Sequence, residues 1–176
     1  MEASSSVLTK KDNWYGFPLE SWYDGQRDKQ KKKLYAAEAD FFLLDCKNIM
    51  PGDAMAILSS VLTNPRFITQ FGSYELSAAN IDFRNKSKST AYSSDKQNIH
   101  IVFGKQYLPR FIVLHELAHC IAPNITHHGR LFCKVYAELI RIYYNHAIQM
   151  KFEKNLREFG VKHYHKSEDS YYNGIG

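Results

Sequence analysis

Residues 110–132 read RFIVLHELAHCIAPNITHHGRLF, and they are the most informative segment of the 176-residue chain. Residues 110–122 are strongly apolar and stop before Pro123, a length that predicts a buried helix because buried strands rarely exceed about eight residues. On such a helix His115 and His119 are four positions apart and share one face, about one turn from each other. Both imidazoles can therefore bind one metal ion.

Glu116 lies about 100° around this helix from the preceding histidine, too far for a natural third ligand. Its carboxylate can still reach a water bound to the metal. A catalytic zinc ion takes three protein ligands and keeps one position open. The third ligand is expected after the proline, where residues 127–129 read His-His-Gly. We prefer His128 as this ligand and keep His127 as the alternative.

Two other interpretations of the histidines compete with a catalytic site. In the first, the histidines lie exposed on a core helix and bind no metal, since short HExxH strings also arise by chance. In the second, a zinc ion only stabilises the fold, which requires a fourth protein ligand. Cys120 and Cys133 are near in sequence, but Cys120 is predicted to point away from the shared histidine face.

The composition of the chain is that of a globular protein. It is 44% hydrophobic and 23% charged, which excludes disorder throughout. No apolar run has the length of a membrane-spanning helix or a signal peptide, so we expect a cytoplasmic protein with no membrane contact. The net charge of +5 favours acidic partners, and DNA contact is one expectation. A reducing compartment fits the three cysteines, which form no CxxC pair: Cys46, Cys120 and Cys133.

The chain divides into an N-terminal arm (1–25), a domain that contains the histidine motif (26–161) and a C-terminal tail (162–176). The arm has scattered aromatic residues and no helical periodicity, so we expect it to pack on its own domain or to be held by a protein partner.

Hydrophobic periodicity and turn residues predict an α+β fold, with helices packed on a small antiparallel sheet of about three strands. Asn64-Pro65 should end the second helix, because the residue before proline avoids helical geometry. The helix that follows the motif is long, ends near Gly160 and can break near Asn145. Besides the motif helix, the predicted elements are helices at about 26–45, 51–64 and 129–159 and strands at 74–83, 89–94 and 98–103.

Residues 115–132 resemble the HExxH, variable loop, His-Gly-x-x-Phe pattern of SprT-like zincin metallopeptidases, which include the Spartan-type proteases of DNA–protein crosslinks. The chain is more similar still to a group of small bacterial and phage zinc metallohydrolases. In that group an Arg-Asp-x-Gln segment and a Tyr-Ala-Ala-Glu segment precede the active helix. Here they stand at residues 27–30 and 34–38. The resemblance covers about residues 26 to 161.

This resemblance implies a zincin-like fold and one zinc ion per chain, held by His115, His119 and His128. It also implies that Glu116 is the general base and that Phe132 packs beneath the third ligand. The cysteine-rich zinc ribbon of the larger family members is missing from this sequence, as is any recognisable partner-binding tail. A DNA-repair role is therefore not implied.

The sequence thus predicts a zinc metallopeptidase that acts on a protein or peptide substrate. Glu116 would take a proton from the attacking water and pass it to the leaving amine. The alternative is a non-catalytic zincin-fold protein that binds or assembles with DNA or protein partners. The candidates for DNA contact are Lys29, Lys31–Lys33, Arg84, Lys86, Lys88 and Lys96. The candidates for stabilising the oxyanion are His127, Tyr136 and Tyr107.

Overall fold

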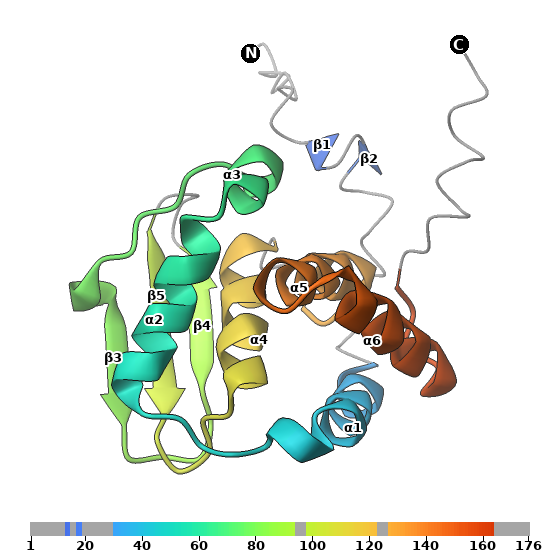
Figure 1. The fold of residues 1–176 in the computed structure, drawn as a ribbon, viewed down its shortest axis with the longest axis horizontal. Helices are drawn as coiled ribbons and strands as arrows, with labels where there is room; N and C mark the ends of the chain where they lie inside the picture. Colours follow the sequence, from blue (N-terminus) through green and yellow to red (C-terminus); the bar gives the residue numbers. More distant parts are fainter. Residues whose placement is uncertain (1–12, 15–16, 19–29, 94–97, 123–126, 164–176) are drawn as a thin grey trace, which may run out of the picture.

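The computed structural model describes residues 13–14, 17–18, 30–93, 98–122 and 127–163. Its architecture is α+β, as predicted: six α-helices accompany a three-stranded sheet within these residues (Figure 1). Helix α4 lies beside strand β4, and α5, α6 and α1 lie on the side of α4 away from the sheet. The predicted histidine helix therefore lies between the sheet and helices α1, α5 and α6 (Figure 1).

The helices are α1 Lys31–Phe41, α2 Pro51–Leu62, α3 Pro65–Phe71, α4 Arg110–Ile121, α5 Arg130–Tyr143 and α6 His146–Glu158. Single turns of 3-10 helix occur at η3 Leu43–Asp45 and η4 Ala78–Asn80. The three-stranded sheet contains β3 Ile81–Arg84, β4 Thr90–Ser93 and β5 Ile99–Gly104. Two short N-terminal strands, β1 Asn13–Trp14 and β2 Phe17–Pro18, pair antiparallel with each other.

The three-stranded sheet is mixed, so the prediction of an antiparallel sheet is wrong. Its order is β3-β5-β4, with β4 antiparallel and β3 parallel to β5. The reason is the apolar character of β5, whose Ile99, Ile101 and Phe103 side chains are fully buried. This strand takes the centre, where both of its edges are paired, and the more exposed β3 and β4 take the edges.

The connection from β3 to β4 crosses the carboxyl end of β5 instead of forming a hairpin. It passes so close to Gly104 that a Cβ atom there would lie 2.5 Å from the Lys86 carbonyl oxygen. The backbone amide of Gly104 also donates a hydrogen bond to the Ser89 hydroxyl. Glycine is therefore required at this crossing point.

Two further predicted elements differ from the structure. Only Ile81–Arg84 of the predicted strand 74–83 forms a strand, and Glu75 makes a single isolated bridge to Asn98. Helix α3 was not predicted, although Asn64-Pro65 was correctly expected to end α2. The Asn64 side chain accepts a hydrogen bond from the Arg66 amide, so the same pair that ends one helix caps the next.

The predicted long C-terminal helix forms two helices, and the break lies where the sequence allowed it. Tyr144 leaves helical geometry, and the Asn145 side chain accepts a hydrogen bond from the Ile148 amide at the start of α6. Gly160, just after α6, has a positive φ of 67°.

Parts of the predicted chain ends lie outside the described residues. These are most of the arm at 1–25, the tail beyond residue 163, and the start of the first predicted helix at 26–29. In the part of the chain that is described, no helix is both long and apolar enough to cross a membrane.

Candidate metal centre

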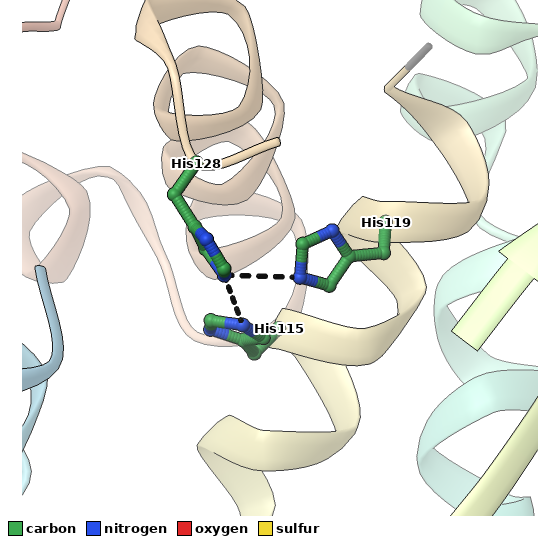
Figure 2. A group of neighbouring side chains, drawn as sticks. All are labelled: His115, His119 and His128. Atoms are coloured by element: carbon green, nitrogen blue, oxygen red, sulfur yellow. Dashed lines mark hydrogen bonds between the residues drawn. The ribbon is translucent and has the colours of Figure 1, made fainter. Parts of the chain in front are cut away.

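Three imidazoles from two separate elements converge on one point (Figure 2). His115 and His119 project from the same face of α4, as their spacing predicted. His128 comes from the turn that precedes α5. The Nε2 atom of His128 lies 3.1 Å from Nε2 of His119 and 3.3 Å from Nε2 of His115. The three histidines therefore lie close enough to bind a metal ion.

The nitrogen spacing suits a small tetrahedral ion. With metal–nitrogen bonds of about 2.0–2.1 Å, tetrahedral geometry separates neighbouring ligand nitrogens by about 3.3–3.4 Å. Both of the Nε2–Nε2 distances at His128 fall near this value. All three ligand atoms lie within 4.8 Å of one another.

The turn before α5 directs His128, not His127, to the cluster. His127 has a φ of 43°, in the left-handed region, and its side chain is exposed. This conformation turns the chain so that the next side chain points inward, and His128 is only 5% exposed. Of the two alternatives, His128 is therefore the one that joins the histidines of α4.

Glu38 of α1 contacts the His115 imidazole at Nδ1, the ring nitrogen that does not face the other two histidines. Its Oε1 atom lies 2.6 Å from Nδ1 of His115, and both side chains are almost fully buried. A carboxylate at this nitrogen fixes the ring orientation and leaves Nε2 free to bind a metal. Glu38 is the last residue of the Tyr-Ala-Ala-Glu segment, and the sequence predicted no role for it. Its signal was its place on the apolar face of the helix, four residues after Leu34 and next to Ala37.

Burial and neighbouring charges shift the pKa values at the cluster. Burial alone would lower the pKa of His115, but the Glu38 carboxylate outweighs it and holds that pKa above its ordinary value. Burial, together with the other two imidazoles, lowers the pKa of His119 to about 2. His119 is therefore neutral near pH 7, as a metal ligand must be.

Glu116 follows His115 in α4, lines the same cavity and is only 7% exposed. Burial raises its pKa to about 7, although the neighbouring His115 opposes this rise. A carboxyl group with such a pKa can both accept and release a proton near neutral pH.

Gln30, immediately before α1, holds the backbone of the third histidine. Its side-chain amide donates hydrogen bonds to the carbonyl oxygens of His128 and Lys162, and its oxygen accepts one from the Lys162 amide at 2.9 Å. The Cys133 thiol also donates to the His128 carbonyl, at 3.6 Å. Gln30 is the last residue of the Arg-Asp-x-Gln segment, and the sequence predicted no role for it either.

Aromatic rings enclose the imidazoles on two sides. The Phe132 ring contacts all three, with centroids 5.0, 4.4 and 4.9 Å from His115, His119 and His128. Tyr35 covers another side, 5.7 Å from the His115 ring and 5.4 Å from the His128 ring. Apolar walls of this kind exclude water and strengthen electrostatic interactions within the site.

The three candidate oxyanion residues occupy different places. Tyr136 is fully buried behind His115, and its hydroxyl donates to the Phe111 carbonyl at 3.4 Å. It is not among the residues that line the cavity beside the cluster. His127 is exposed near the cluster. Tyr107 lines a cavity that adjoins the cluster.

No fourth protein ligand joins the cluster within the described residues. The Cys120 thiol points toward the sheet, where the Tyr92 and His100 carbonyl oxygens lie 3.6 and 3.9 Å away. This orientation agrees with the expectation that Cys120 faces away from the histidines. A set of three ligands leaves one position of a tetrahedral ion open to solvent or substrate.

A cavity of about 460 Å³ opens beside His115 and Glu116. Its walls come from α1, from residues 87–90, from Tyr107 and from the first half of α4. Two of the lysines predicted to contact DNA, Lys31 and Lys88, contribute to these walls. Lys29 and Lys96 lie outside the described residues.

Comparison of the chain with protein-family models, with curated proteins and with solved structures finds no match. The chemistry of the site must therefore be argued from its own residues.

Proposed function

We propose that the protein is a zinc-dependent hydrolase with zincin-like architecture that cleaves peptide bonds. The observation that carries the proposal is the convergence of three imidazole Nε2 atoms, with a carboxylate next to them at the edge of a cavity. Neutral imidazole nitrogens at tetrahedral spacing are a typical zinc ligand set. Three ligands and an open position are the arrangement of a catalytic zinc site rather than a structural one.

The histidines and the two neighbouring glutamates would have different roles in hydrolysis. His115, His119 and His128 would hold the ion, and Glu38 would orient the first of them. A zinc ion held there would supply Lewis-acid catalysis, because it acidifies the attacking water and polarises the scissile carbonyl. Glu116 would accept the proton of that water and donate it to the leaving amine. Its carboxyl group is buried and lies on the cavity wall next to His115, which suits both steps.

The strand order favours one edge of the sheet for binding an extended peptide. β5 is paired on both sides, so its backbone groups are already used. β4 pairs only with β5 among the described strands, and it packs beside α4. We therefore place the substrate backbone along β4.

Metal analysis and peptide hydrolysis, measured on matched variants, test the proposal. We expect the wild-type chain to hold one zinc ion and to cleave an unfolded protein substrate. Glu116→Gln should retain the ion and lose hydrolysis, because it keeps the shape of the side chain and removes the base. His128→Ala should lose the ion, while His127→Ala, one residue away, should keep it.

Each outcome bears on a different part of the proposal. If Glu116→Gln cleaves as fast as wild type, Glu116 is not the base. If wild type holds zinc and cleaves no protein or peptide, the alternative of a non-catalytic binding protein is favoured. If His127→Ala rather than His128→Ala loses the ion, the ligand set is wrong.

A further inference from the structure

The cavity beside Glu116 combines an apolar wall with two positive charges. Tyr35, Ala39, Phe111 and Ile112 contribute apolar surface. Lys31 and Lys88 contribute the positive charges, from two segments far apart in sequence. A ligand that fits both features has an apolar stem and an anionic end.

Lys31 is directed toward the site by an aromatic ring. Its Nζ atom lies 5.4 Å from the centroid of the Tyr35 ring, within the range of a cation–π interaction. The same Tyr35 ring contacts the imidazoles of His115 and His128. The Tyr35 ring therefore contacts both the Lys31 ammonium group and two of the proposed metal ligands.

Lys88 lies in the cavity wall formed by residues 87–90, where the backbone is tightly packed. Its carbonyl oxygen lies 2.9 Å from the position of a Cβ on Gly104, so the 85–89 crossing is tightly packed at this point. Ser87, Ser89 and Thr90 line the same wall and bring hydroxyl groups. Hydroxyl groups beside a lysine are suitable donors for a carboxylate oxygen.

The acidic side chains of the cavity have other roles. The Glu38 carboxylate is hydrogen-bonded to Nδ1 of His115, and Glu116 is the base in the proposed mechanism. Neither lysine has a carboxylate partner within 4 Å among the described residues. The cavity is therefore lined by two lysines without a carboxylate partner among the described residues.

We propose that this cavity binds a carboxylate-bearing residue of the substrate peptide, so that the enzyme prefers to cut next to a negative charge. This inference rests on the proposed function and names the substrate class of the same site. The carboxylate has two possible sources: an acidic side chain within the peptide, or the free carboxyl group at its C-terminus.

Cleavage of a mixed peptide library by the full-length zinc-loaded protein tests the preference for a carboxylate beside the cut. We expect mass spectrometry of the products to show Asp and Glu enriched about tenfold over Asn and Gln at one position beside the cut. Amidation of the peptide C-termini separates the two sources. It leaves the products unchanged if the carboxylate is a side chain, and it abolishes cleavage if it is the terminal carboxyl group.

Charge-reversed variants connect the preference to the cavity. Lys31→Glu and Lys88→Glu should each remove the acidic preference and shift the products toward Lys and Arg. Lys32→Glu is the matched control, since Lys32 is an exposed neighbour on α1 that does not line the cavity. It should leave the preference unchanged. An equal response of all three variants would show a general charge effect and overturn the inference.

A binding measurement separates this inference from the proposed function. Fluorescein-labelled Glu and Gln versions of one library peptide are titrated against Glu116→Gln, in which hydrolysis is not required. We expect about tenfold tighter binding of the Glu version and loss of the difference when Lys88→Glu is added. Cleavage and binding that are indifferent both to acidic side chains and to amidation of the peptide C-terminus overturn the cavity assignment alone. Absence of all cleavage, with the binding preference intact, overturns the hydrolase proposal alone.

Discussion

At the scale of single residues, the buried contact between Glu38 and His115 is the most informative about the metal centre. The carboxylate lies 2.6 Å from Nδ1, so it holds the ring in the tautomer that presents Nε2 to a metal. We predict that Glu38→Gln weakens zinc binding about 10- to 100-fold, because the amide keeps the shape but loses the negative charge. Competition with a zinc chelator measures this affinity. Glu75→Gln, at an exposed position, is the control and should bind zinc like wild type.

The three cysteines are expected to differ in reactivity. Burial raises the pKa of Cys120 to about 12, so almost no thiolate is present at pH 8. Cys133 is also buried, and only Cys46 is partly accessible. We predict that one thiol of the native protein reacts rapidly with Ellman's reagent and that all three react after unfolding. Cys46→Ala should remove the rapid phase, and a rapid phase that survives this change would contradict the packing at Cys120 or Cys133.

At the scale of elements, Gly104 is where the crossing of β5 can be tested. A Cβ there would lie 2.5 Å from the Lys86 carbonyl oxygen and 2.9 Å from that of Lys88. Because both obstacles are backbone atoms, we predict that Gly104→Ala destabilises the fold by about 1–3 kcal/mol in urea unfolding. Gly52→Ala, in helix α2 with nothing within 4 Å of the added atom, should instead stabilise it by about 0.5–1 kcal/mol. Equal effects of the two substitutions would contradict the crossing.

The elements also mark how far the sequence could predict the fold. Helix α4 was predictable because its apolar residues, its length and the closing proline all indicate one structure. The strand pairing was not, because alternation identifies a strand without giving its neighbour, and turn residues between β3 and β4 fit a hairpin as well as a crossing. Helix α3 was missed because Asn64-Pro65 signals the end of one helix and the start of another equally well.

The histidine cluster was predictable only where its residues are close in sequence. The spacing of His115 and His119 determined their common face, and the turn left His128 and His127 as alternatives that the backbone at residue 127 resolves. Glu38, by contrast, is 77 residues from its histidine partner. Contacts over such a separation depend on how α1 packs in the tertiary fold, which local sequence patterns do not report.

At the scale of the whole molecule, the histidine cluster joins separate parts of the fold. The cluster connects α4 to the turn before α5, and Glu38 adds α1. We predict that zinc at about 100 times its dissociation constant stabilises the folded chain by about 2.7 kcal/mol, because the ligands are assembled only on folding. The melting temperature with zinc and with a chelator measures this effect. His119→Ala should melt at the same temperature under both conditions, and a zinc response that survives the substitution would contradict the site.

Gln30 also has a consequence for any shortened version of the protein. Its single amide group bridges the His128 turn and the peptide unit of Lys162, so the residue before α1 and the segment after α6 meet beside His128. Trimming from either side past this bridge removes a brace on the His128 turn while leaving every ligand in place. The shortest fragment that still retains zinc as firmly as the intact chain should therefore begin no later than residue 30 and end no earlier than residue 162.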